Sequence, residues 1–422
     1  MVKSIKLATI AQRALLLGVG FVCLISVFFI FKWCFAYTIA RNSEFKEVAE
    51  FAVNLAPNIP QSHYTLAVLT EKTFLPEDLA KSLAEYEKAT ALAPNDYRMW
   101  FALGKARERS GDADGAELAL KKAVELAPNY ARVLWADGNI LLRQNKTAEG
   151  FAEMRKAAEG DKTFINPLVA TAWQIFDGDI AQVKQNVGDS TQINFVLPTF
   201  LAKQNRFDEA FAIWDSLPAD AKKTTFKENS EEFFKQLLET KKYRDALRVR
   251  AQINDAGAEN IAVGTISNAS FETDITPNSD IFGWQIADGI QPQIGYDIAQ
   301  KRGGNQSLVI VFNSPNGQDF RAISNTVVVE SGKNYGFEAF YKSNLKTSAT
   351  LRWEIVDASD TKVLAATEAV AANADWTGLT ASFTVPETTQ AITIRLARDV
   401  CKISPCPIAG KIWFDDFNLI NR

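Results

Sequence analysis

The sequence predicts a multidomain α + β protein with a transmembrane helix, an α-helical solenoid and a C-terminal antiparallel β-sandwich. Three observations predict this fold class: an uncharged apolar run near the start, a proline-containing tetrapeptide that recurs at helical-repeat spacing, and a change from helical to alternating hydrophobic period near residue 264. A chain of 422 residues is long for one core, so several structural units are expected. We place them at 1–41 (cytoplasmic stub and membrane anchor), 42–162 (helical repeats), 163–256 (divergent helical hairpins), 257–264 (linker) and 265–422 (β-sandwich).

Composition argues against nucleic acid as a partner. The chain carries 46 Lys and Arg against 50 Asp and Glu, for a formal net charge of −4, and no basic stripe is visible. The single histidine, His63, falls on a predicted repeat helix, where a packed or surface role is expected.

The apolar run from Ala14 to Phe31 contains no charge and is long enough to cross a bilayer core. Apolar character resumes after Lys32, so residues 14–40 are expected to contact the membrane. Basic residues precede the run, which favours a cytoplasmic N-terminus and places the bulk of the chain outside the cytoplasm, in the periplasm of a Gram-negative cell. These residues are Lys3, Lys6 and Arg13. A cleaved signal peptide and a buried soluble helix are the alternatives, and the length of the run disfavours the first.

The tetrapeptide Leu-Ala-Pro-Asn marks the predicted solenoid. It occurs at 92–95 and again at 126–129, an offset of 34 residues, and an earlier copy at 55–58 lies 37 residues upstream. A period of 34 with a proline between helical patterns is typical of helix-turn-helix repeats. Gly104 and Ala116 are small where the two helices of one repeat are expected to approach closely.

Within this period the segment resembles the tetratricopeptide repeat (TPR) family. The resemblance is carried by Trp100, Leu103, Gly104, Ala116, Leu120, Ala123 and Pro128, and Arg107 departs from it. We expect repeat helices near 61–72 and 77–92, a third repeat over 131–159, and divergent hairpins from 166 to 253. Stacked hairpins leave a concave surface, which predicts a protein partner there. A rigid spacer between membrane and C-terminal domain is the alternative.

Beyond the linker, short alternating runs predict seven or eight strands and therefore a β-sandwich. The runs are 307–312, 334–342, 350–356, 379–385, 391–397 and 411–419. Motifs at both ends resemble the carbohydrate-binding jelly rolls grouped with families 4, 9 and 22. They are Ile266 to Glu272, Phe282-Gly283-Trp284 and Gly410 to Leu419. The resemblance implies a lectin-like domain and a structural Ca²⁺ site at Glu272, Asp415 and Asp416. Strand-end hydrogen bonds are the alternative for these carboxylates.

Alternation sorts the predicted strands into two faces. One set is expected in the core: Tyr335, Phe337, Ala339, Tyr341, Leu351, Trp353 and Ile355. The opposite set forms the predicted glycan site: Glu338, Phe340, Lys342, Arg352, Glu354 and Arg395. One aromatic ring among planar polar groups can stack on and hydrogen-bond a sugar. A plain solvated sheet face is the alternative.

Cys401 and Cys406 close a short loop and are expected to form a disulfide if this part of the chain is in an oxidising compartment. Free or metal-bound cysteines are the alternative.

Together these features predict a non-catalytic, membrane-anchored envelope protein that acts in the assembly or capture of cell-surface or exported polysaccharide. The alternative is an assembly factor of an envelope or secretion complex whose jelly roll binds protein. A glycosidase is disfavoured because Asp415 and Asp416 are adjacent in one strand, where neighbouring side chains point to opposite faces.

Overall fold

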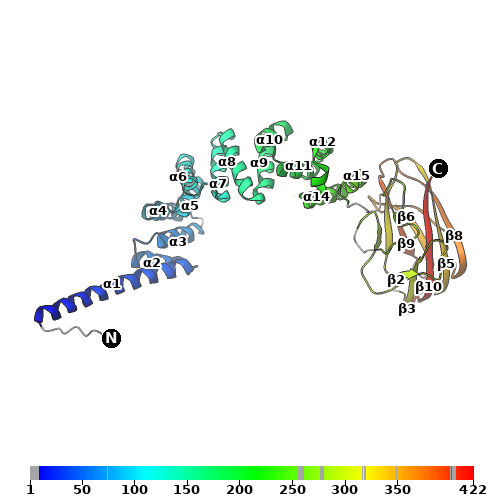
Figure 1. Ribbon diagram of the computed structural model, residues 1–422, viewed down its shortest axis with the longest axis horizontal. Helices are drawn as coiled ribbons and strands as arrows, with labels where there is room; N and C mark the ends of the chain where they lie inside the picture. The colour runs from blue at the N-terminus through cyan, green and yellow to red at the C-terminus, as the bar shows by residue number, and fades with distance from the viewer. Residues whose placement is uncertain are drawn as a thin grey trace, which may run out of the picture. The chain divides into compact units, whose positions relative to one another are not determined.

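A computed structural model describes residues 9–73, 75–254, 261–275, 280–315, 317, 320–347, 349–399, 401 and 405–422 (Figure 1). It divides into two compact units, Met1–Ile193 and Asn194–Arg422. The predicted flanking charges Lys3 and Lys6, and residues 257–260 of the predicted linker, lie outside the described residues.

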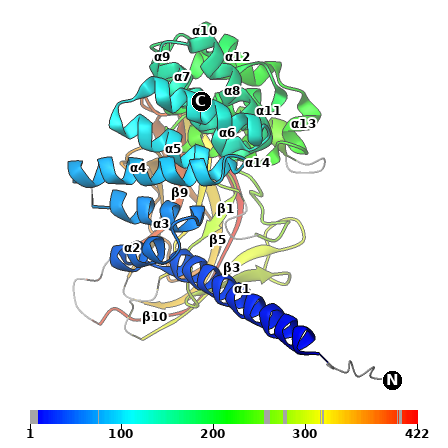
Figure 2. The ribbon, with the colours of Figure 1, turned by 90° about the vertical axis from the view of Figure 1, so that its left-hand side faces the viewer.

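Helix α1 (Ile10–Asn42) is, in the described part of the chain, the one helix long and apolar enough to cross a membrane. Its length and composition suit a membrane span or a signal sequence. At 1.5 Å per residue it is about 50 Å long, which exceeds a hydrocarbon core of about 30 Å. The excess length lies at the C-terminal end of α1, whose last turns pack on α2 (Lys46–Leu55) and α3 (Pro60–Glu71) (Figures 1 and 2). Ala36 and Ala40 are fully buried in this contact.

The predicted repeat helices are confirmed as antiparallel hairpins, because α3 packs on α4, α5 on α6 and α7 on α8. Their bounds are α4 Pro76–Leu92, α5 Tyr97–Ser110, α6 Ala113–Leu126, α7 Ala131–Arg143 and α8 Thr147–Gly160. The predicted close approach is confirmed too. A Cβ atom on Gly104 would lie 2.6 Å from the Leu120 Cγ atom, and one on Gly138 would lie 2.8 Å from the Gly150 carbonyl oxygen.

His63 has the packed role that its position predicts. Its ring is buried in α3, with Nδ1 2.5 Å from a Glu85 carboxylate oxygen and Nε2 2.7 Å from the Pro57 carbonyl oxygen. It therefore ties the two helices of one hairpin together, α3 and α4, and ties both to the turn that follows α2.

The predicted divergent hairpins are also helical. Their bounds are η1 Lys162–Phe164, α9 Ile165–Ile175, α10 Ile180–Val187, α11 Thr191–Lys203, α12 Phe207–Ser216, α13 Ala219–Lys223, α14 Lys227–Glu239 and α15 Tyr243–Ile253. Within the second unit, aromatic contacts hold these helices together. Phe195 stacks on Phe226 with ring centroids 4.2 Å apart, and Trp214 lies 5.1 Å from Phe233.

Helix α15 is hydrogen-bonded to the β-sandwich of the same unit. Arg244 Nη2 donates to the Val329 carbonyl oxygen at 3.0 Å, and the Tyr243 hydroxyl donates to the Ala358 carbonyl oxygen at 3.0 Å. Arg250 forms an ion pair with Asp280. The last helix and the sandwich are therefore parts of one packed body.

The C-terminal strands form two antiparallel sheets, in the orders β1-β4-β9-β6-β7 and β2-β3-β10-β5-β8. Their bounds are β1 Trp284–Ile286, β2 Gln293–Asp297, β3 Ser307–Ser314, β4 Ile323–Val328, β5 Asn334–Thr347, β6 Leu351–Asp357, β7 Val363–Ala366, β8 Asn373–Thr384, β9 Ala391–Arg398 and β10 Ile408–Asn421. The six predicted strands are confirmed. The expected total of seven or eight is too low. Strands β1, β2 and β7 have only 3, 5 and 4 residues, and β4 buries a polar residue, Asn325, where alternation expects an apolar one.

The core lies between the two sheets and is built around Trp353. Its ring lies 4.9 Å from Phe417, 5.2 Å from Phe414 and 5.8 Å from Trp284. All seven residues predicted by alternation to face the core are buried. The start and end of the domain lie side by side as expected, since the Phe417 amide donates to the Ala269 carbonyl oxygen.

Candidate functional site

Three of the predicted glycan-site residues lie on the outer face of the sheet β2-β3-β10-β5-β8. Glu338, Phe340 and Lys342 alternate on β5 with core residues, and each is half-buried. The guanidinium of Arg302 lies over the Phe340 ring, with its central carbon 3.5 Å from the ring centroid. Lys342 pairs with Asp375 of β8 at 2.9 Å. This group of side chains, with Arg302, is called the Phe340 face below.

Trp413 also lies on this face, and sequence reasoning did not predict it as a site residue. It pairs with Lys342 of β5 and Val309 of β3, while its neighbours Ile412 and Phe414 are buried in the core. Because all three consecutive residues are apolar, alternation of residue type gives no sign of its direction. Arg302 was missed for another reason, because it lies in a loop without any periodic pattern.

The Trp413 indole is held in place by Asp297 at the end of β2. Its Nε1 donates to a carboxylate oxygen of Asp297 at 2.9 Å. Burial acts to raise the pKa of Asp297, but hydrogen bonds from Trp413 and from the backbone of Ala299 and Gln300 outweigh it and hold the pKa below its usual value. The carboxylate therefore stays ionised and keeps the indole in one orientation.

The other three predicted residues lie on the opposite sheet, so the predicted single face is wrong. Arg352 and Glu354 are on β6 and Arg395 is on β9, in the sheet β1-β4-β9-β6-β7. The two sheets pack face to face, so their outer faces point away from each other. Alternation correctly predicts which side chains point outward, but it carries no information about which strands share a sheet.

On that opposite face the charges neutralise one another. Arg395 Nη2 lies 2.9 Å from Glu354, and Arg352 lies 3.5 Å from Glu354 and 3.0 Å from Asp399. Glu354 itself is only 9% exposed. Two guanidiniums and two carboxylates thus form one connected network of ion pairs.

The carboxylates of the predicted calcium site hold a loop against the last strand. Asp415 is fully buried and accepts from the backbone amides of Arg302, at 2.9 Å, and Gly303, while Asp416 pairs with the Arg302 guanidinium. Glu272 accepts from the Asn305 amide at 2.9 Å. No group of three metal-ligating side chains converges in the described ranges. The groups around these carboxylate oxygens are N–H donors, whereas a Ca²⁺ ion is surrounded by oxygen ligands, so the arrangement does not fit a Ca²⁺ site. Binding of Ca²⁺ by these residues stays a prediction.

One expectation about this strand is wrong. Asp415 and Asp416 do not point to opposite faces, because β10 has a bulge between Asp415 and Asn418 and Asp416 adopts a φ of 52°. Both carboxylates therefore meet the loop at Arg302. Burial raises the pKa of Asp415, against the backbone hydrogen bonds that it accepts.

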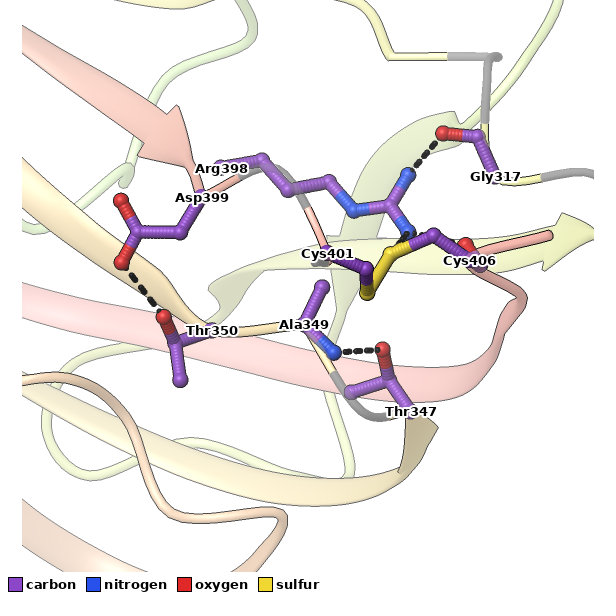
Figure 3. The surroundings of a disulfide bond; sticks show 8 residues. All are labelled: Gly317, Thr347, Ala349, Thr350, Arg398, Asp399, Cys401 and Cys406. Atoms are coloured by element: carbon purple, nitrogen blue, oxygen red, sulfur yellow. Dashed lines mark hydrogen bonds between the residues drawn. A yellow bond between two sulfur atoms is a disulfide. The ribbon is translucent and has the colours of Figure 1, made fainter. Parts of the chain in front are cut away.

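The predicted disulfide between Cys401 and Cys406 is confirmed, with Cα atoms 5.6 Å apart (Figure 3). Arg398 donates to the Cys406 carbonyl oxygen at 2.6 Å and also to the carbonyl oxygen of Gly317. Burial lowers the pKa of Arg398. The bridge and this guanidinium hold together the loops at one end of the sandwich, away from the Phe340 face.

Comparisons with known proteins bear on each part of the chain. Residues 263–399 match the family model CBM_4_9, a carbohydrate binding domain; the match stops before β10. A solved structure described as "CBM4 structure and function" is 18% identical, covers 37% of this chain and 100% of its own, and has a TM-score of 0.28. A crystal structure of MamA is 16% identical in sequence, and the similarity covers 47% of this chain and 89% of the MamA chain, with a TM-score of 0.28.

A Clostridium thermocellum xylanase 10B structure, containing CBM22-1 and GH10 modules with xylohexaose, is 18% identical over 38% of this chain and 29% of its own, with a TM-score of 0.26. No curated protein matches the sequence. The chain consists of an apolar N-terminal helix, a TPR-like helical part, and a β-sandwich that matches the carbohydrate binding domain family over residues 263–399.

Proposed function

We propose that the β-sandwich binds a glycan on the Phe340 face and that the protein is a non-catalytic envelope protein. The match of residues 263–399 to a carbohydrate binding domain is the observation that carries this proposal. The carboxylates nearest the face support a binding role over hydrolysis. Asp415 is fully buried and Asp416 is paired with Arg302, whereas a glycosidase needs two carboxyl groups that flank a bond.

The Phe340 face suits a glycan better than the opposite sheet face does. The Arg302 guanidinium rests on the Phe340 ring, so it presents a flat cationic surface that remains 41% exposed at the side chain. Lys342 adds a donor and Glu338 adds an acceptor. Hydroxyl groups and uronate carboxylates are the ligands that this combination recognises through charge-assisted hydrogen bonds. On the opposite face the predicted residues, Arg352, Glu354 and Arg395, include no aromatic ring.

We further propose that α1 is an uncleaved membrane anchor and that the rest of the chain lies outside the cytoplasm. The disulfide supports an oxidising compartment. In this arrangement the TPR-like array presents the sandwich and binds a protein partner, and the protein acts in assembly or capture of cell-surface or exported polysaccharide.

A glycan array probed with the full chain in detergent tests the binding proposal. Phe340→Ala and Arg302→Ala should each weaken binding about tenfold, the effect of losing roughly 1–2 kcal/mol of aromatic or charge-assisted contact. Arg352→Ala on the opposite sheet is the matched control and should leave binding unchanged. If only Arg352→Ala weakens binding, the site lies on the opposite face. If no glycan binds, the sandwich is a protein-binding domain, which is the alternative function.

Membrane topology is tested separately. A reporter fused after residue 42 should be active only outside the cytoplasm, and the protein should stay in membranes after a carbonate wash. Release of a soluble protein with a new N-terminus near residue 40 would identify α1 as a cleaved signal peptide.

A further inference from the structure

Two cavities adjoin on the first unit, along the first helices of successive hairpins. One, of about 570 Å³, is lined chiefly by α5, α7 and η1. The other, of about 430 Å³, is lined by the end of α1 and by α3, α5 and the start of α7. Phe101 and Arg132 line both, so the two cavities form one continuous groove, called the array groove here.

The array groove is positively charged in a chain whose net charge is −4. Its walls carry Arg41, Arg98, Lys105, Arg109, Arg132 and Arg143, against the single acid Glu108.

Three of these cations are neutralised by carboxylates. Arg98 pairs with Asp96 at 2.5 Å, Arg143 pairs with Glu108 at 3.3 Å, and Arg109 pairs with Glu71. In the part of the chain that the structure describes, the side chains of Arg41, Lys105 and Arg132 have neither an ion-pair nor a hydrogen-bond partner; the charge of Arg132 acts at longer range on Asp161, whose pKa it helps to lower. These three unpaired cations within one groove require an anionic ligand or bulk water to balance them.

Aromatic side chains make the apolar walls between these cations. Trp135 lies 5.1 Å from Phe164 at an interplanar angle of 33°, and Tyr97 lies 5.3 Å from Tyr130 at 59°. Each of these rings leans on its neighbour at an angle, so the pairs offer apolar surface to a side chain of a ligand. Apolar surface interleaved with cations favours a peptide that carries both acidic and apolar side chains as the occupant.

The spacing of the helices sets the length of that occupant. Packed helices lie about 8–10 Å apart, so the three steps from α1 through α3 and α5 to α7 span roughly 25–30 Å. An extended chain rises about 3.3 Å per residue, so the groove accommodates about eight or nine residues.

We propose that the array groove binds an extended acidic segment of a partner protein. Carboxylates of the segment pair with Arg41, Lys105 and Arg132, and one large apolar side chain enters the cavity between Phe101 and Trp135. The inference adds the partner's chemistry to the proposed protein-binding role of the array, and it does not depend on glycan binding by the sandwich.

An array of random peptides of about nine residues, the length derived above, probed with the full chain in detergent, tests this inference. Bound peptides should be enriched in Asp and Glu and should contain an aromatic or large aliphatic residue. Replacing Glu by Gln in the best binders should weaken binding about tenfold or more, and added salt should do the same.

Arg132→Glu should abolish the enrichment. Lys121→Glu is the matched control, because Lys121 is an exposed cation on α6 outside both cavities, and it should change nothing. Circular dichroism should be the same for both variants, because both side chains are exposed.

Three outcomes would overturn the proposal: no enrichment of acidic peptides, enrichment that survives Arg132→Glu, or Arg132-dependent binding of polygalacturonate in place of peptide. Glycan binding by the sandwich should be the same in the Arg132→Glu variant as in the unchanged protein, so a failure here is distinguishable from a failure of the glycan proposal.

Discussion

The helical array and the β-sandwich fill their cores in opposite ways. In the array, small residues let the helices of a hairpin touch, as Gly138 does against the Gly150 backbone and Gly104 against Leu120. In the sandwich, large rings fill the space between two sheets, with Trp353 surrounded by Trp284, Phe414 and Phe417. The first core depends on close approach of backbones and the second on side-chain volume.

This contrast teaches what kind of change each part tolerates. Enlarging a residue is the damaging change where backbones touch, because backbone atoms do not swing aside. Truncating a residue is the damaging change where a ring fills the core, because neighbours collapse only partly into the space. Each prediction below is measured as a change in the free energy of unfolding of the affected part.

Trp353→Ala should have the largest effect. It removes a fully buried ring at the centre of the sandwich and should lower the free energy of unfolding by about 3–5 kcal/mol. Calorimetry should show the loss in the transition of the second unit, Asn194–Arg422, to which the sandwich belongs. Phe340→Ala on the outer face is the control, and it should lower the free energy of unfolding by about 1 kcal/mol or less. If the two effects were reversed, the core and outer faces would be assigned backwards.

Gly138→Ala should destabilise the array by about 1–3 kcal/mol, because the new Cβ would meet the Gly150 carbonyl oxygen at 2.8 Å. Gly160→Ala is the control, since its Cβ would meet nothing closer than 3.8 Å. That change should be neutral or stabilising by up to about 1 kcal/mol, the difference in helix propensity. Chemical denaturation of both variants measures the change in the free energy of unfolding. Equal changes would mean that close approach of the two helix backbones does not determine the stability of this core.

Asp137→Asn should stabilise the array in a pH-dependent way. Burial, together with Glu153 and Glu117 nearby, raises the pKa of Asp137 to about 6, and its Oδ1 atom has no hydrogen-bond partner in the described structure. Because the folded-state pKa lies above the usual 3.8, the folded state prefers the protonated acid. Stability from this residue is therefore full below about pH 4 and is lost as the pH rises through about 6.

The Asn variant avoids this loss, so it should gain about 1–2 kcal/mol over the native chain near pH 8, after allowance for solvent screening. Near pH 4 the gain should vanish. Thermal melts at both pH values make the measurement, and a gain that does not depend on pH would mean that the charge of Asp137 is not its cause.

Arg352→Ala should have the smallest effect, about 0–1 kcal/mol, because the guanidinium is partly exposed and Glu354 keeps its contact with Arg395. Urea unfolding at low and high salt should show a small difference that salt reduces. A loss above about 2 kcal/mol would mean that the connected ion-pair network of this sheet face stabilises the sandwich as much as buried groups do.

The candidate site was predicted in part. Alternation placed Glu338, Phe340 and Lys342 outward correctly, because a strand's period of two is a local property. It combined them wrongly with Arg352 and Arg395, because membership of a sheet depends on pairing between strands far apart in sequence. The loop that places Arg302 over Phe340 has no period at all, so its contribution appears only in the folded chain.

By itself, the sequence determined the apolar helix, the helical hairpins with their small-residue contacts, the change to strands at the C-terminal part, and the disulfide. Each of these follows from spacing along a short stretch of chain, where geometry is local. Only the tertiary structure decided which outward side chains share a face, that Asp415 and Asp416 meet the same loop across a bulge, and that Arg41, Lys105 and Arg132 share one groove. These relations join residues from separate strands, loops and helices, and no local period encodes how such segments pack.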